Sequence, residues 1–287
     1  MTTSALTIKG LTKKFKRFCL GPIDLDVQKG TVVALIGANG SGKSTFLRVL
    51  MNVLKADEGD VFSFGDHFMN NEANLKQKIG YVGNRFESYS QLTIKELSTL
   101  ISYWYPTWDQ KRYKDYLIRY EIDENMKYGD GSTGTRKKVE FIFALCHDSN
   151  LLLLDEPSAG MDILSQRKMK EDLLSYMEDE ERSILIATHV IDEVEQLADY
   201  IAVMEQGNIV HTFNKDDVRE HWARVWVSEV TDSLKEQTQV IRISNHPPEI
   251  VTNNLLALEE ELERQQIPIH QIQRLTIEEV VENLIHK

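Results

Sequence analysis

The sequence has little cysteine, no long apolar run and a deficit of positive charge. Its two cysteines, Cys19 and Cys146, are too few for a disulfide framework, so we expect two buried thiols in a reducing compartment. The longest apolar runs, such as FIFALC, are much shorter than the roughly 18 residues that suggest a membrane span. The N-terminal residues MTTSALTIKG have no charged segment followed by an apolar one, so we expect no secretory signal.

Acidic residues outnumber basic ones, with 45 Asp and Glu against 33 Lys and Arg and a net charge of −12. Binding of nucleic acid requires a basic face that neutralises phosphates, so no nucleic acid is expected as the main partner. The apolar content of 41% is ordinary for a protein with a sizeable core. A length of 287 residues allows one large α/β domain with an appendage, or two modest domains.

Short apolar strands alternate with helical patterns along most of the chain. Residues 6–27 predict strands with alternating apolar residues. The segments TVVALIG, KIGYVGN, LLLLDE and SILIATH predict buried strands, and the patterns that follow several of them predict helices. This alternation indicates an α/β fold with a mainly parallel sheet covered on both faces.

Two regions depart from this alternation. Eight of the ten tyrosines lie between Tyr81 and Tyr128, and a capping box joins Thr93 to Glu96, so we expect an inserted helical subdomain over about residues 85–136. Its aromatic residues form either the core of the subdomain or a groove for a partner. Residues 216–287 predict a small C-terminal extension of unknown role, with a second capping box from Thr276 to Glu279.

The segment GANGSGKST, residues 37–45, fits the phosphate-loop pattern G-x-x-x-x-G-K-[ST] and lies between a predicted strand and a predicted helix. Backbone N–H groups of such a loop surround phosphate oxygens, the lysine reaches the β- and γ-phosphates, and the hydroxyl after it can bind Mg²⁺. The predicted nucleotide-binding residues here are Gly37, Asn39, Gly40, Ser41, Gly42, Lys43, Ser44 and Thr45, with Ser44 also a metal ligand.

Two carboxylates and a histidine follow the predicted buried strands. LLLLDE, residues 151–156, places Asp155 and Glu156 at a strand end, where open α/β sheets bind ligands. We expect Asp155 to hold Mg²⁺ and Glu156 to orient or deprotonate an attacking water. His189 ends the segment ILIATH and can reach the γ-phosphate.

The segment GDGSTGTRKKVEFIFAL, residues 129–145, raises a different question. Small residues precede a helical pattern, and such a helix start presents free N–H groups to an anion. Arg136, Lys137 and Lys138 oppose the helix dipole in the first turns, which indicates that a strong negative charge comes to meet them.

Taken in order, these motifs resemble those of the ATP-binding subunit of an ABC transporter, over roughly residues 5–215. The resemblance implies a phosphate-loop NTPase core, an N-terminal antiparallel β subdomain and the cofactors ATP and Mg²⁺. Ser132 and Gly134 match the family's LSGGQ signature, in which Thr133 and Thr135 replace the first glycine and the glutamine. The resemblance also assigns Asp162 to the loop that crosses the dimer interface. Asn84 takes the place of a glutamine near the γ-phosphate and the metal, and Phe15 that of an aromatic residue stacked on adenine.

The resemblance implies an assembly. Two chains, this one and either a second copy or a paralogous ATPase subunit, would pack head to tail, so that Ser132–Thr135 hold the partner's phosphate. Separate integral-membrane permease subunits would supply the pore, and the chain would lie in the cytoplasm against the inner face of the membrane. Residues 274–287 look like the terminal helix of ABC-2 exporters, and residues 103–109 look like a bacterial subgroup associated with peptide export or resistance.

Two other functions are compatible with parts of the sequence. A non-transport ABC ATPase would act on ribosomes or DNA, but such proteins usually carry two fused ATPase halves or long coiled coils. A regulatory GTPase is suggested by NKDD, residues 214–217, which fits the guanine-reading pattern N-K-x-D. The chain has no D-x-x-G motif, which a GTPase needs to sense the γ-phosphate, so this reading is disfavoured.

Overall fold

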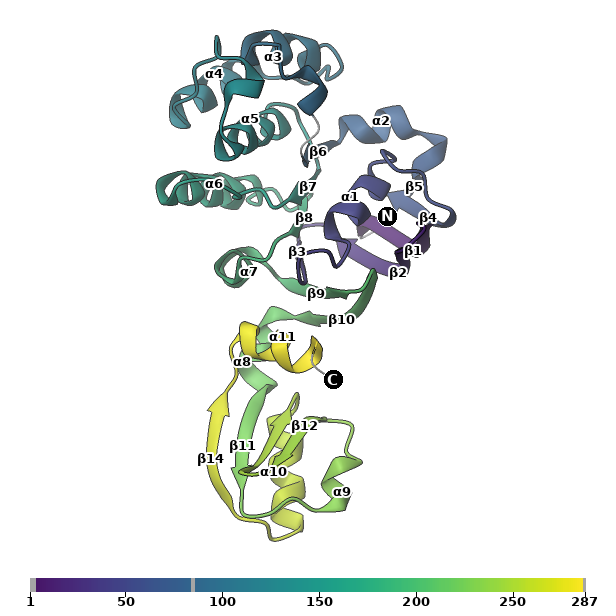
Figure 1. The fold of residues 1–287 in the computed structure, drawn as a ribbon, viewed down its shortest axis with the longest axis vertical. Helices are drawn as coiled ribbons and strands as arrows, with labels where there is room; N and C mark the ends of the chain where they lie inside the picture. Colours follow the sequence, from purple (N-terminus) through teal and green to yellow (C-terminus); the bar gives the residue numbers. More distant parts are fainter. Residues whose placement is uncertain (1–3, 84–85, 286–287) are drawn as a thin grey trace. The chain divides into compact units, whose positions relative to one another are not determined.

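The structure is a computed structural model that describes residues 4–83 and 86–285. Contacts divide the chain into two compact units, Met1–Val210 and His211–Lys287, and each is described by itself (Figure 1). The division lies close to residue 215, where the sequence predicts the end of the ATP-binding domain. None of the helices in the described part of the chain is both long and apolar enough to cross a bilayer.

The centre of the first unit is a six-stranded sheet with the order β10-β9-β3-β8-β7-β6. Its strands are β3 (Val32–Ile36), β6 (Ile79–Val82), β7 (Leu151–Asp155), β8 (Ser183–Ala187), β9 (Tyr200–Glu205) and β10 (Asn208–Asn214). The pairs β3–β8, β3–β9, β7–β8 and β6–β7 are parallel, and every residue of β3, β6, β7 and β8 is buried. Parallel pairing brings the carboxyl ends of these strands to one edge of the sheet.

A second, antiparallel sheet with the order β2-β1-β4-β5 is formed by the N-terminal residues. Its strands are β1 (Ser4–Lys14), β2 (Cys19–Gln28), β4 (Glu58–Ser63) and β5 (Asp66–His67). Leu6, Ile8 and Leu20 of this sheet share one hydrophobic core with Phe46 and Leu153. The α/β fold with an N-terminal antiparallel sheet is therefore confirmed.

The helices of the first unit lie between these strands in the chain. They are α1 (Lys43–Leu50), α2 (Glu72–Gln77), α3 (Ile94–Ser102), α4 (Gln110–Arg119), α5 (Thr133–Leu145), α6 (Ile163–Tyr176) and α7 (Ile191–Leu197), with the 3-10 turns η1 (Phe68–Asn70), η2 (Glu87–Tyr89) and η3 (Tyr128–Asp130). The helices α3, α4 and α5 gather beside one another in Figure 1, where the sequence predicts the inserted helical subdomain, and α5 continues beyond the predicted bound at about residue 136. The capping box predicted from Thr93 to Glu96 is confirmed at the start of α3.

The aromatic residues of the subdomain divide into two groups. Tyr113, Tyr120 and Tyr128 are fully buried, and the ring centroid of Phe143 lies 6.1 Å from that of Tyr113. These side chains form the subdomain core, as one of the two interpretations predicted. Tyr103 is 81% exposed and Trp104 is 64% exposed, so these two do not belong to that core.

The two cysteines also differ. Cys146 is buried, and burial raises the pKa of its thiol. Cys19 is exposed, so the expectation that both thiols are buried was wrong for this one. The physical reason is strand periodicity: Cys19 begins β2, in which most alternate side chains face solvent.

The second unit has its own antiparallel sheet, with the order β12-β13-β11-β14. Its elements are α8 (Lys215–His221), β11 (Ala223–Val227), α9 (Asp232–Lys235), β12 (Val240–Asn245), β13 (Pro248–Thr252), α10 (Leu255–Arg264), β14 (Ile269–Arg274) and α11 (Ile277–Ile285). Leu258 and Leu262 of α10 pack in one core with Val225 and Ile250 of the sheet. The second predicted capping box is confirmed, because Thr276 N–H donates to Glu279 Oε2 over 2.9 Å and Glu279 N–H donates to Thr276 Oγ1 over 3.2 Å.

The capping box of α3 provides a test of the subdomain's local stability. Thr93 Oγ1 accepts a hydrogen bond from Glu96 N–H at 3.1 Å, so Thr93→Ala leaves this N–H without its cap. We expect the free energy of unfolding to fall by about 1 kcal/mol, measured by urea denaturation. Thr99→Ala on the same helix is the matched control. Its hydroxyl bonds only to Lys95 O, so alanine should cost nothing there. Equal losses in the two variants would contradict the capping argument.

Candidate functional site

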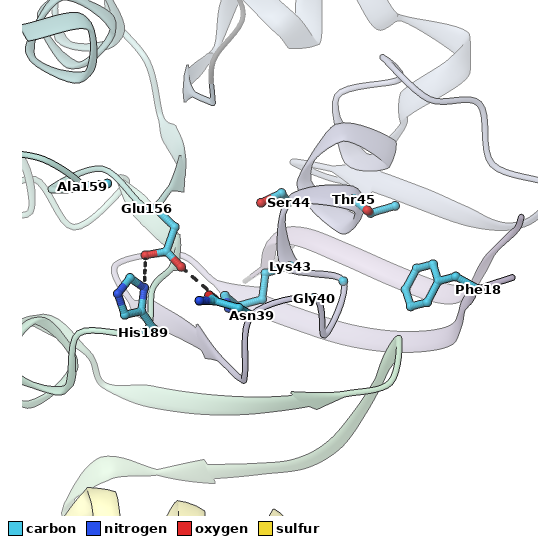
Figure 2. Close-up of a pocket in the computed structure, with 10 residues that line it drawn as sticks. Phe18, Asn39, Gly40, Lys43, Ser44, Thr45, Glu156, Ala159 and His189 are labelled. Atoms are coloured by element: carbon cyan, nitrogen blue, oxygen red, sulfur yellow. Dashed lines mark hydrogen bonds and ion pairs between the residues drawn. The ribbon is translucent and has the colours of Figure 1, made fainter. Parts of the chain in front are cut away.

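A cavity of about 330 Å³ lies beside the loop between β3 and α1. Figure 2 shows side chains from this loop facing others that come from the ends of β7 and β8. The cavity is lined by Phe18, Asn39, Gly40, Gly42, Lys43, Ser44, Thr45, Glu156, Ala159 and His189. The fold therefore brings the predicted phosphate loop, one of the two predicted carboxylates and the predicted histidine to one place.

The phosphate loop is shaped by glycine immediately before α1. Gly42 has a φ of 115°, which side-chain-bearing residues rarely adopt, and it is the N-cap of α1. This conformation lets α1 begin beside the cavity, with the free N–H groups of its first turn available to an anion. Gly37 and Ser41 do not line the cavity among the described residues, but Ser41 is buried within the loop and its N–H donates to Ala38 O at 3.1 Å.

Lys43 is 6% exposed and is held by the loop itself. Its Nζ donates to Gly37 O at 2.7 Å and lies 3.7 Å from Glu156 Oε1 (Figure 2). A buried ammonium needs such partners because its desolvation is costly. The charge of Lys43 is thereby fixed at the cavity wall, between the loop and the carboxylate.

Ser44 and Asp155 bring a hydroxyl and a carboxylate together at the phosphate loop. Ser44 Oγ donates to Asp155 Oδ1 at 2.8 Å. Burial raises the pKa of the Asp155 carboxyl, while the Ser44 hydrogen bond and the nearby charge of Lys137 oppose that rise. The described residues contain no cluster of three or more His, Cys, Asp or Glu side chains that could hold a metal. A hydroxyl and a carboxylate side by side fit Mg²⁺, which takes few protein ligands and completes its shell with phosphates and water.

Glu156 and His189 meet at the ends of the neighbouring parallel strands β7 and β8. His189 Nδ1 lies 2.6 Å from Glu156 Oε2, as the dashed line in Figure 2 marks. Glu156 has a φ of 46°, an uncommon conformation for a residue with a side chain, and its N–H donates to Ala187 O at 2.8 Å. Strained backbone of this kind is concentrated at functional sites, where surrounding contacts maintain it.

The signature segment Ser132–Thr135 lies elsewhere on the chain. Ser132 is the N-cap of α5 and its Oγ accepts from Thr135 N–H at 3.1 Å. Ser132 and Thr133 are exposed, whereas Gly134 is buried. Among the residues that the structure describes, those that line the cavity do not include this segment.

The three basic residues that follow the signature segment have partners within the chain. Arg136 Nη2 donates to Gly129 O at 2.7 Å, Lys137 Nζ to Asp155 O at 2.7 Å, and Lys138 Nζ to Asp162 Oδ2 at 3.1 Å. These cations therefore already have partners within the chain, and the expectation that a strong negative charge comes to this helix start stays a prediction. Their long side chains reach carbonyl and carboxylate oxygens of neighbouring segments, which compensate the unfavourable helix dipole.

Asp162 is the N-cap of α6. It accepts hydrogen bonds from Ser165 Oγ at 2.6 Å and from Ser165 N–H at 2.9 Å. These bonds and the ammonium of Lys138 hold the pKa of Asp162 well below its usual range. The segment that carries Asp162 is thus linked to the signature helix of the same chain.

Two predicted residues remain apart from the cavity or outside the description. Phe15 does not line the cavity among the described residues, but its ring centroid lies 6.0 Å from that of Phe18, which does. Stacking of adenine on Phe15 stays a prediction. Phe18 was not predicted from the sequence, although it is a second aromatic residue close to Phe15. Asn84 lies outside the described residues.

Comparisons with known proteins agree with this geometry. Residues 20–159 match the family model described as "ABC transporter". The chain is 30% identical over 195 residues to the ABC transporter ATP-binding protein NatA of Bacillus subtilis, covering 66% of this chain and 79% of that protein. The chain belongs to the ABC transporter ATP-binding family. It is an ATP-hydrolysing subunit of that family, as the phosphate loop and strand-end carboxylates predicted.

Other relatives extend the likeness. The ABC transporter ATP-binding protein YtrB of Bacillus subtilis is 28% identical over 221 residues, covering 76% of this ATPase and 75% of that protein. The bacitracin transport ATP-binding protein BcrA of Bacillus licheniformis is 25% identical, covering 74% and 70% of the two chains. A solved structure described as the ATP-binding subunit of an ABC transporter has a TM-score of 0.67 at 24% identity, covering 76% of this chain and 92% of its own, and shows the same fold.

The close packing of Gly134 leads to a prediction. A Cβ at this position would lie 2.1 Å from Gly160 O, so Gly134→Ala must displace the start of α5. We expect steady-state ATP hydrolysis to fall by about tenfold or more, because small displacements of positioned groups are costly. ATP affinity, measured by fluorescence titration, should not change. Gly131→Ala is the milder comparison: its φ of −69° suits alanine, and a Cβ there would lie 3.2 Å from Thr135 Cγ2, so that a small side-chain shift relieves the contact. Wild-type turnover by Gly134→Ala would contradict the packing argument.

Proposed function

We propose that this ATPase hydrolyses Mg-ATP at two composite sites of a head-to-tail dimer and drives separate membrane subunits of a bacterial exporter. The observation that carries the proposal is the separation of the two halves of the site. Ser132 and Thr133 are exposed at the start of α5, away from the cavity that Lys43 and Ser44 line. An exposed helix start with free N–H groups suits the phosphate of a second chain.

Each half of the site has a chemical task in this proposal. Lys43 and the N–H groups of residues 37–45 bind the β- and γ-phosphates of the substrate. Ser44 and Asp155 would hold Mg²⁺, whose charge stabilises phosphate oxygens in the transition state. Glu156 Oε1 orients or deprotonates the attacking water, while His189 holds Oε2. Ser132–Thr135 and Asp162 of the partner would complete the site, and Asn84 would sense the γ-phosphate.

Transport through a separate permease is supported by membership of the ABC transporter ATP-binding family. Export is supported by the likeness of residues 274–287 to the ABC-2 branch and by the bacitracin transport relative. We place the ATPase on the cytoplasmic face of the membrane, bound to the permease as a homodimer or with a paralogous ATPase subunit.

A mixed-dimer experiment tests the composite site. Lys43→Ala disables the phosphate loop, and Ser132→Arg blocks the start of α5 with a bulky side chain. Each variant alone should be inactive. A mixed dimer has one site with both defects and one intact site. We expect recovery on mixing to at most about a quarter of the wild-type hydrolysis rate, because half of randomly paired dimers are mixed.

If hydrolysis requires both sites, ATP-dependent pairing is the better measurement. Glu156→Gln is added to both chains so that bound ATP is retained, and differently tagged chains are co-purified with ATP. Differently tagged chains that carry Glu156→Gln and no other substitution are the control. Absence of both recovered hydrolysis and mixed pairing would show that Ser132–Thr135 do not serve the partner's phosphate.

Association with a permease tests the transport assignment. A tagged chain expressed at its native level should be recovered from membranes in mild detergent with an integral-membrane subunit in comparable amount. The same tag on an unrelated soluble protein is the control. Recovery with ribosomes or DNA, and without a membrane protein, would instead favour the non-transport ATPase that the sequence left open.

A further inference from the structure

Helix α5 carries two buried ionisable side chains that the proposed chemistry does not use. Lys137 is 4% exposed and Glu140 is 1% exposed. Such residues are rarely buried without polar partners, because desolvation of their charges is costly. Lys137 Nζ donates to the main-chain oxygen of Asp155 at 2.7 Å. Glu140 Oε2 accepts from Gly83 N–H at 3.0 Å, and its Oε1 accepts from Tyr128 OH at 2.9 Å.

The main-chain partners of these two side chains belong to neighbouring strand ends. Asp155 ends β7 and Gly83 follows β6, and these strands are paired in parallel from Ile79–Leu151 to Val82–Leu154. Helix α5 is therefore hydrogen-bonded to the ends of two adjacent strands, with Lys137 as the donor and Glu140 as the acceptor. Tyr128 belongs to η3, which leads directly into the signature segment. The contacts thus connect the signature segment to the strand end that carries the catalytic carboxylates.

We propose that Lys137 is a positioning residue that couples the two composite ATP sites of the dimer. This inference rests on the proposed head-to-tail function. In that dimer, Ser132–Thr135 of one chain serve the partner's nucleotide, whereas Asp155 and Glu156 of the same chain serve its own nucleotide. A shift of α5 on contact with the partner's phosphate therefore moves the main chain of Asp155 through the Lys137 bond.

The position of the hydrogen bond supports coupling rather than direct catalysis. Lys137 binds the main-chain oxygen of Asp155, and Ser44 binds the carboxylate of the same residue. The carboxylate can therefore remain a metal ligand while the strand end is held from α5. Among the described residues, those that line the cavity do not include Lys137. Loss of Lys137 should therefore alter the response of one site to the other without altering nucleotide binding by the phosphate loop.

Lys137→Met tests this role, because methionine has a similar length but no donor. Methionine leaves the main-chain oxygen of Asp155 without this donor, so the unfolding midpoint is measured beside the activity. We expect the hydrolysis rate at saturating Mg-ATP to fall by about tenfold, because loss of the Lys137 bond displaces the end of β7. The Hill coefficient for ATP should fall from the wild-type value to about 1, the value for uncoupled sites. ATP affinity of the dilute monomer, measured by fluorescence titration, should not change.

Two further variants make the test specific. Lys114→Met is the matched control, because Lys114 is in the same subdomain but forms an exposed ion pair with Glu124. It should keep the wild-type rate and Hill coefficient. Lys137→Arg retains a charged donor and should recover part of the cooperativity. A purely structural lysine would instead change the unfolding midpoint without changing the Hill coefficient.

The outcomes separate this inference from the proposed function. If Glu156→Gln chains do not pair on ATP addition, the head-to-tail function fails and the coupling fails with it. If they pair, but folded Lys137→Met keeps the wild-type rate and Hill coefficient, only the coupling is wrong. A wild-type Hill coefficient of about 1 would also overturn it. If Lys137→Met does not fold, Lys137→Gln, whose amide is shorter and uncharged, must show the same loss of cooperativity for the inference to stand.

Discussion

The burial of strand β7 is the constraint on which the site depends. Leu151, Leu152, Leu153 and Leu154 are at most 1% exposed, and β7 pairs with a parallel neighbour on each side. Removing one such side chain typically costs about 2–5 kcal/mol, so the strand cannot shift without losing much of the core. The carboxyl end of β7 is therefore held in place by the core. Asp155 and Glu156 extend from that end toward the phosphate loop and β8.

The strand end also concentrates charge in a protein that is acidic as a whole. Lys43, Lys137 and Asp155 are each less than one-tenth exposed, and each contacts polar atoms of another segment, Lys43 through Glu156. These contacts are necessary because an isolated buried charge would be unfavourable. The same bonds join three segments that are distant in sequence: the phosphate loop, the signature helix and the β7 end. Binding and catalysis are consequently connected to the packing of the core.

The motifs and the order of the main elements could be predicted from the sequence. Buried strands are visible as apolar runs such as LLLLD, and the phosphate loop as a fixed spacing of glycines, Lys43 and Ser44. Two capping boxes could be predicted because each depends on two residues that are three positions apart. Strand β14 could not be predicted, because all of its side chains are exposed and its sequence has no alternating apolar pattern. Local patterns therefore predicted those elements whose burial or capping depends on local spacing.

Contacts between distant segments were decided only by the tertiary structure. The sequence shows Arg136, Lys137 and Lys138 as three cations at a helix start, but their partners Gly129, Asp155 and Asp162 become neighbours only when the sheet and helices pack. The same holds for Phe18, which reaches the cavity wall because β2 lies near the phosphate loop. Sequence by itself determined which side chains have chemistry that suits phosphate and metal, because that chemistry belongs to the residue type. Which of them meet, and which cations are already satisfied, depends on distances that only the folded chain establishes.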